Sequence, residues 1–207
     1  MLVATGDIWE FYNKGYYVVI PTNLGWKRNG ANVMGRGLAL QAAKLFPDLP
    51  QSYGQACQDG LAKPYYVYEP RLILLPSKPL DEQNPQLSWT AKASLKLIRS
   101  GVSLLGSGLF QKVAIPIVGC GNGELAPRDI VPVLNGLLDD RFTLVDLDED
   151  RLPWKGKERC MKCTFKVEDW SIKHRICNAC RKSGYSPSKT AKGYRRSSTG
   201  SNSIGSD

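Results

Sequence analysis

The chain has 207 residues, of which 42% are hydrophobic, and it carries a formal net charge of +9. This length suffices for one well-packed domain and a small appendage. No stretch approaches about 18 consecutive apolar residues, so the sequence predicts no membrane span. The first residues do not form the basic segment and apolar core of a secretory signal, which favours a protein of the reducing cytoplasm.

The basic charge is concentrated at one end of the chain. Residues 1–150 hold 14 Lys and Arg against 15 Asp and Glu, whereas residues 151–207 hold 14 against 4. This asymmetry predicts a near-neutral folded domain joined to a basic module, which would bind phosphate backbones or acidic surfaces. A solubilising tail is the alternative.

In chain order, the first predicted element is a short strand that ends in Gly6-Asp7-Ile8. A carboxylate just past a strand end can accept hydrogen bonds from a base amino group or a ribose hydroxyl. The other interpretation of Asp7 is a helix N-cap. A second strand follows over residues 17–23.

The long loop 24–33 comes next, and it leads through Met34-Gly35-Arg36-Gly37 into a predicted helix over residues 38–46. Glycine lets the backbone approach a phosphate closely, and the N–H groups that begin a helix point at such a ligand. The stretch 29–41 therefore predicts an anion site. An ordinary strand-to-helix turn is the alternative.

Two β-like runs, 65–68 and 72–75, precede Lys78. The second run is apolar throughout, as expected of a strand covered on both faces. Lys78 is then either a solvated loop residue or a cation or nucleophile facing the crevice where strand ends meet. The spacing of apolar residues over 86–99 predicts an amphipathic helix with Ser88 as its N-cap.

A second glycine-rich loop, 119–123, follows a predicted buried strand over 112–118 and precedes a helix over 127–134 and a last strand over 142–147. Two such loops facing one cleft would clamp two phosphates. Neither has the Gly-Lys-Ser/Thr ending of a P-loop or the full Gly-x-Gly-x-x-Gly fingerprint, which disfavours ATP hydrolysis and a Rossmann dinucleotide site.

These motifs, in this order, resemble those of macro domains, the α/β/α modules that bind ADP-ribose. The resemblance covers about residues 1–148, and it implies a three-layer α/β/α domain with a mixed sheet over residues 1–150. The run 34–41, with Phe46-Pro47 and Pro76-Ser77-Lys78, is similar to the branch that contains terminal ADP-ribose glycohydrolases and the antitoxin that removes ADP-ribose from DNA. Ser77 stands where that branch usually has threonine.

The resemblance also implies roles for individual residues. Asp7 would contact adenine, the first glycine loop would hold the distal ribose and diphosphate, and the second would wrap the diphosphate. Lys78 would attack or stabilise C1 of the distal ribose, with Glu124 as a candidate general base. Which asparagine of the first loop reaches the ribose stays open. The implied ADP-ribose-binding residues are Asp7, Ile8, Asn23, Asn29, Asn32, Met34, Gly35, Arg36, Gly37, Gly119, Cys120, Gly121, Asn122 and Gly123.

Four cysteines in the basic module form two Cys-x-x-Cys pairs, Cys160 with Cys163 and Cys177 with Cys180, 13 residues apart. Two such pairs supply four thiolates for a structural Zn²⁺ ion, and so predict a zinc ribbon over residues 151–183. Disulfides and rubredoxin-like iron are the alternatives. The Ser-, Gly-, Lys- and Arg-rich residues 184–207 predict a disordered basic tail.

Together these features predict an ADP-ribosyl glycohydrolase that acts on nucleic acid or protein, with a zinc ribbon that targets it to nucleic acid. We expect a monomer that does not bind membranes. Two other functions remain open at this stage: a non-catalytic reader of ADP-ribose, and a phosphatase of ADP-ribose 1″-phosphate.

Overall fold

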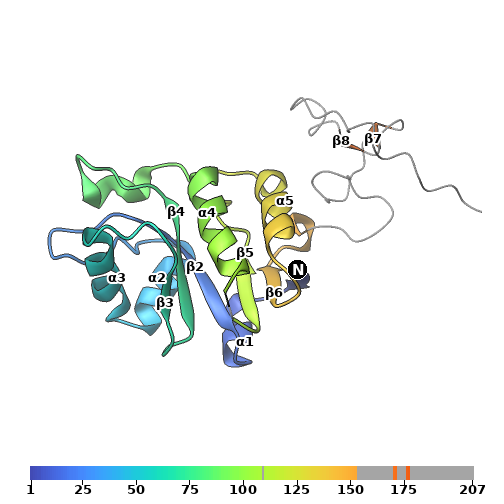
Figure 1. Ribbon diagram of the computed structural model, residues 1–207, viewed down its shortest axis with the longest axis horizontal. Helices are drawn as coiled ribbons and strands as arrows, with labels where there is room; N and C mark the ends of the chain where they lie inside the picture. Colours follow the sequence, from blue (N-terminus) through green and yellow to red (C-terminus); the bar gives the residue numbers. More distant parts are fainter. Residues whose placement is uncertain (109, 153–169, 172–175, 178–207) are drawn as a thin grey trace, which may run out of the picture.

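The computed structural model describes residues 1–108, 110–152, 170–171 and 176–177 (Figure 1). A six-stranded sheet with the order β1-β6-β5-β2-β4-β3 forms its centre. β3 runs antiparallel to β4, and the other neighbouring strands are parallel. The strands are β1 Leu2–Thr5, β2 Tyr17–Asn23, β3 Tyr65–Val67, β4 Leu72–Lys78, β5 Val113–Pro116 and β6 Phe142–Asp146.

Helices cover both faces of this sheet. α1, α2 and α3 pack on one face, and α4 and α5 pack on the other (Figure 1). This arrangement confirms the predicted three-layer α/β/α fold with a mixed sheet. The helices are α1 Ile8–Asn13, α2 Gly37–Leu45, α3 Leu49–Gln58, α4 Leu95–Gly106 and α5 Pro127–Leu137, with short 3₁₀ helices η1 Pro85–Thr90 and η2 Glu149–Arg151.

The continuous apolar runs of the central strands follow from this layering. Val18 and Ile20 pack with α2 and α3, whereas Val19, between them in sequence, packs with α4 and α5. All three side chains are fully buried. Because successive side chains of a strand point to opposite faces, a strand between two helical layers must be apolar at every position.

The prediction of one continuous helix over residues 86–99 is wrong. η1 ends at Thr90, and α4 begins only at Leu95. Ser94, not Ser88, is the N-cap, since its hydroxyl accepts a hydrogen bond from the Leu97 N–H at 3.2 Å. Ser88 Oγ instead accepts from the Asp81 N–H at 2.9 Å.

Long-range backbone hydrogen bonds cause this break. Ala93 N–H donates to the carbonyl of Gly123 at 3.0 Å, and Ser94 N–H donates to the carbonyl of Ser77 at 2.8 Å. Both donors would lie inside a helix that ran from 86 to 99, where they would be needed by carbonyls four residues earlier. The segment is therefore held extended between β4 and the second glycine loop.

The parallel strands all end at the same edge of the sheet. β2 ends at Asn23, β4 at Lys78, β5 at Pro116 and β6 at Asp146. In open α/β sheets ligands bind in the crevice outside the carboxyl ends of such strands. A ligand site is therefore expected at this edge of the sheet.

Two short antiparallel strands, β7 Trp170–Ser171 and β8 Ile176–Cys177, lie within the predicted zinc ribbon. Trp170 pairs with Cys177. The other three predicted zinc ligands, Cys160, Cys163 and Cys180, and the predicted tail 184–207 lie outside the described residues. Among the residues that are described, no helix is both long and apolar enough to span a bilayer.

Candidate active site

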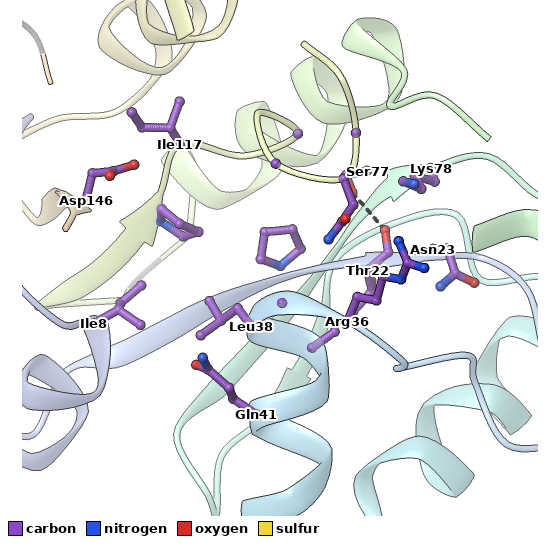
Figure 2. A pocket seen from close by; sticks show the side chains of 18 of the residues that line it. Ile8, Thr22, Asn23, Arg36, Leu38, Gln41, Ser77, Lys78, Ile117 and Asp146 are labelled. Carbon is purple, nitrogen blue, oxygen red and sulfur yellow. Dashed lines mark hydrogen bonds between the residues drawn. The ribbon is translucent and has the colours of Figure 1, made fainter. Parts of the chain in front are cut away.

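A cleft of about 770 Å³ opens at the carboxyl edge of the sheet. Figure 2 shows it from close by, with Ile8 and Asp146 at one end and Asn23, Ser77 and Lys78 at the other. The two predicted glycine loops form much of its wall. Its volume is in the range usual for small-molecule sites.

Asp7 is an N-cap, one of the two interpretations that the sequence left open, and it also lies at the cleft. Its carboxylate caps α1 by accepting a hydrogen bond from the Trp9 N–H at 3.0 Å, and the residue also lines the cleft next to Ile8. The turn before it is fixed by Gly6, whose N–H donates to the Asp146 carbonyl at 3.0 Å and whose φ is +149°. Capping therefore holds Asp7 in position at this end of the cleft.

The first glycine loop lines the cleft through Gly35, Arg36 and Gly37, and α2 begins at the last of these. Gly37 has a φ of +56°, which a residue with a Cβ adopts only under strain. Met34, by contrast, is buried beneath the loop among the core residues that pack with α2 and α3, and it does not line the cleft. The residues after Met34, and not the methionine itself, face the cleft.

The three candidate asparagines have different positions. Asn23 lines the cleft, while its side chain donates to the Val33 carbonyl at 2.8 Å and accepts from the Gly25 N–H at 2.9 Å. Asn32 is fully buried and donates to the carbonyls of Asn23 and Gly25. Asn29 is exposed outside the cleft lining. All three thus shape the loop, and Asn23 alone of them reaches the cleft.

The second glycine loop contributes Gly119, Gly121, Asn122 and Gly123 to the lining. A Cβ on Gly123 would lie 2.5 Å from the carbonyl oxygen of Gly119, so the loop's tight path requires glycine there. Cys120 does not line the cleft and packs against the core instead. Burial raises the pKa of its thiol to about 12, which keeps it protonated and makes it a poor nucleophile.

Lys78, the last residue of β4, projects at the end of the cleft opposite Asp146 (Figure 2). Its Nζ donates to the backbone carbonyl of Trp89 at 2.7 Å. Partial burial lowers the pKa of this amine below its usual value, Arg36 lowers it further, and Glu124 acts in the opposite direction. Ser77, the neighbouring residue, joins β4 to β2 through a hydrogen bond to the Thr22 carbonyl at 2.9 Å.

Glu124 lies just outside the cleft lining. It adopts a φ of +62°, unusual for a residue other than glycine, and its carboxylate pairs with Lys92 Nζ at 2.9 Å. The hydrogen bond and charge of Lys92 lower the pKa of this exposed carboxyl, so it is ionised at neutral pH. Its charge still acts on Lys78.

Several residues of the cleft were not among the predicted site residues, and three of them carry polar or aromatic groups that bear on its chemistry. Asp146 at the end of β6 pairs with Arg151 at 3.4 Å, and both line the end near Ile8. Trp89 lines the opposite end, with the Arg36 guanidinium 5.6 Å from its ring centroid. Asp146 could have been predicted as a cleft residue, because it ends the last parallel strand. Trp89 could not, because it fell within the continuous helix predicted over residues 86–99, which the structure does not contain.

No family model matches the chain. Among curated proteins, the DNA ADP-ribosyl glycohydrolase of Thermus aquaticus is 28% identical over 115 residues, which are 47% of this chain and 28% of that protein. The Mycobacterium tuberculosis protein of the same name is 27% identical over 147 residues, 65% of this chain and 39% of that protein. The chain therefore spans less than half the length of these relatives.

The chain is also similar to solved structures, among them the two that follow. Thermosipho africanus DarTG in complex with ADP-ribose matches with a TM-score of 0.56 and 22% identity, over 74% of this chain and 43% of that one. The macrodomain of Mycobacterium tuberculosis DarG matches with a TM-score of 0.53 and 24% identity, over 70% of this chain and 95% of that one. The α/β/α part of this chain therefore has the macro-domain fold.

Proposed function

We propose that this protein is an ADP-ribosyl glycohydrolase that releases ADP-ribose from nucleic acid. The observation that carries the proposal is Lys78, an amine with a lowered pKa at one end of a cleft that two glycine loops enclose. The macro-domain fold and the two curated relatives, which are named DNA ADP-ribosyl glycohydrolases, support the same activity.

In this proposal ADP-ribose lies along the cleft. Its adenine is at the end with Asp7 and Ile8, where the capping carboxylate has an oxygen for the base amino group. The diphosphate lies between the glycine loops at the N-terminus of α2, where free N–H groups and the helix dipole favour an anion. The distal ribose then reaches Lys78.

The chemistry follows from the state of Lys78. A neutral amine attacks the C1″ carbon of the distal ribose, the bond from C1″ to the acceptor breaks, and the acceptor leaves with a proton. Water later hydrolyses the lysine adduct and releases ADP-ribose. The lowered pKa of Lys78 increases the fraction of neutral amine near neutral pH.

A Lys78→Ala substitution tests this role. We expect turnover of ADP-ribosylated DNA to fall by about a hundredfold or more, the scale typical of removing a group that takes part in the chemical step. The affinity for ADP-ribose, measured by calorimetry, should largely remain, because the glycine loops are unchanged. Lys63→Ala, which removes an exposed lysine outside the cleft lining, is the matched control and should leave turnover unchanged.

The same assay separates the other functions. Undiminished turnover in Lys78→Ala would exclude the lysine mechanism. Binding of ADP-ribose by the parent chain without turnover of ADP-ribosylated DNA or protein would indicate a reader. Release of phosphate from ADP-ribose 1″-phosphate would indicate a phosphatase. Offering ADP-ribosylated DNA and protein side by side identifies the acceptor.

We also propose that Cys160, Cys163, Cys177 and Cys180 hold a structural Zn²⁺ ion and that the basic module around them binds nucleic acid. Four thiolates suit the tetrahedral coordination of zinc. Cys177, the first cysteine of the second pair, lies on β8, which pairs antiparallel with β7. When bound, the ion would supply folding energy to a segment too small for a core of its own.

A further inference from the structure

Trp89 is an exposed aromatic side chain at the edge of the cleft. It lines the cleft, yet 38% of its surface remains exposed. An aromatic face that is partly exposed at the edge of a cleft is available to stack on a bound group.

The turn that carries Trp89 is firmly anchored. Ser88, the preceding residue, is fully buried, and its hydroxyl donates to the Pro85 carbonyl at 2.8 Å. On the other side, Gly25 approaches so closely that a Cβ there would lie 1.9 Å from the Pro85 oxygen. The close contact with Gly25 and the hydrogen bonds of Ser88 therefore fix the position of η1, which carries the indole ring.

Arg36 lies over the same ring, with its guanidinium carbon 5.6 Å from the ring centroid. Within the described part of the chain, no acidic side chain forms a salt bridge with this arginine. Its side chain is exposed. The pair therefore offers a flat aromatic surface together with a cation that is available to an anionic ligand.

The position of this pair relative to Lys78 indicates what it would contact. The backbone carbonyl of Trp89 accepts the hydrogen bond of the Lys78 amine, so the residue that carries the ring is in direct contact with the proposed nucleophile. The opposite end of the cleft, with Asp7 and Asp146, is the proposed adenine end. In the proposed binding mode the group bonded to C1″ extends from Lys78 toward Trp89 and Arg36.

We propose that Trp89 and Arg36 form a stacking platform for the nucleobase that carries the ADP-ribose, in a single-stranded nucleic acid. This inference rests on the proposed function. A nucleobase has a face that stacks on indole, and a neighbouring phosphate would pair with Arg36, whereas an acceptor carboxylate or hydroxyl of a protein would gain nothing from the ring. A base within a duplex is already stacked on both sides and would have to be extruded, so an unpaired strand is the favoured form.

A Trp89→Ala substitution in the full chain tests the platform, because it removes the ring and keeps the backbone carbonyl that holds Lys78. Three ligands are compared: free ADP-ribose, a short single-stranded oligonucleotide ADP-ribosylated on one base, and a peptide ADP-ribosylated on a glutamate. We expect kcat/KM for the oligonucleotide to fall about tenfold to a hundredfold, the effect of losing one base–aromatic stack. The Kd for ADP-ribose and kcat/KM for the peptide should change by less than about twofold.

Two further variants sharpen the comparison. Trp89→Phe keeps an aromatic face and should retain most of the activity on the oligonucleotide. Tyr68→Ala removes an aromatic side chain that is 64% exposed outside the cleft lining, and it should change none of the three values. Unmodified oligonucleotide, measured in parallel, corrects for binding by the basic module.

Several results would overturn the inference. An equal loss for all three ligands would show that Trp89 belongs to the ADP-ribose site itself. A loss confined to the peptide would indicate a protein acceptor. No loss for any ligand would exclude a stacking role for Trp89. If the parent chain turns over neither substrate, the same comparison is made on Kd. A parent chain that does not bind ADP-ribose would overturn the proposed function and this inference together.

Discussion

At the scale of single residues, the reactivity of Lys78 depends on three influences that oppose one another. Partial burial and the charge of Arg36 lower its pKa, whereas the carboxylate of Glu124 raises it. Burial is the largest of the three. Because only the neutral amine is a nucleophile, the balance among them sets the pH range of the proposed activity.

Glu124→Gln should therefore move the activity to lower pH. The substitution removes a carboxylate whose charge raises the pKa of Lys78, so this pKa falls further below its usual value. The rising limb of kcat/KM against pH should shift to lower pH, and activity at neutral pH should hold or increase. A pH profile of initial rates measures this, with Asp59→Asn, an exposed acid outside the cleft lining, as the control.

A different result would identify Glu124 as the general base. In that case kcat would fall at every pH, and the midpoint of the rising limb would not move to lower pH. The position of Glu124, paired with Lys92 and outside the cleft lining, leads us to expect the shift instead. The two roles thus differ in the shape of the profile as well as in the rate.

Most of the residues that the sequence predicted for the site line the cleft, because glycine loops and strand ends are local signals. It could not show that Met34 turns into the core, or that Asn32 is fully buried with both amide hydrogens on loop carbonyls. It also could not place Trp89, whose position depends on Gly25 from a distant loop. Side-chain direction in a loop is decided by long-range contacts that local patterns do not contain.

At the scale of elements, the contact between α3 and the first loop determines the shape of that loop. A Cβ on Gly54 in α3 would lie 2.0 Å from the carbonyl oxygen of Gly30 and 2.5 Å from the backbone nitrogen of Asn32. The helix can approach only because it has no side chain there. Asn32 in turn holds the loop around Asn23.

Gly54→Ala should accordingly destabilise the fold. Backbone atoms cannot move aside as a flexible side chain would, so we expect a loss of about 1–3 kcal/mol or more in the free energy of unfolding. ADP-ribose binding should weaken as well, since the displaced loop carries Gly35 and Arg36. Chemical denaturation measures the first effect, and calorimetry measures the second.

Gly136→Ala in α5 is the matched control. No atom lies within 4 Å of a Cβ built on this helical glycine, and its φ is not positive. Alanine should therefore stabilise the helix by about 0.5–1 kcal/mol, mainly by reducing the freedom of the unfolded chain. If both substitutions had the same sign, the close approach of α3 would not be the cause.

Element boundaries show where local patterns fail. The apolar runs predicted β2, β4, β5 and β6 well, because a strand that is buried on both faces is apolar along its length, and this pattern is visible in the local sequence. The segment 91–94 was assigned to a helix, although its N–H groups bond to β4 and to the second glycine loop. These partners are distant in sequence, so periodicity alone could not reveal the break.

At the scale of the whole molecule, charge separates the chain into two parts. Residues 1–150 carry a net charge of −1 and residues 151–207 a net charge of +10. The α/β/α part provides the cleft, and the basic part would supply nucleic-acid affinity that does not depend on ADP-ribose. The two activities should therefore be separable by substitution.

Replacing Cys163 and Cys180 by serine in the full chain should separate them. One cysteine is removed from each pair, so we expect the bound zinc, measured by mass spectrometry of the purified protein, to fall from about one per chain to well below that. Affinity for single-stranded DNA should fall with it. Affinity for ADP-ribose should not change, because the cleft lies within residues 1–152.

Salt dependence tests the electrostatic part of this prediction. If the basic module neutralises about five phosphates of a single strand, log K should fall with log salt with a slope of about −3.5, and the double variant should show a shallower slope. Cys57→Ala, which removes a buried thiol of the core outside the basic module, should keep both the zinc and the slope. Zinc retained in the double variant, or an unchanged slope, would place the metal or the nucleic-acid contacts elsewhere in the chain.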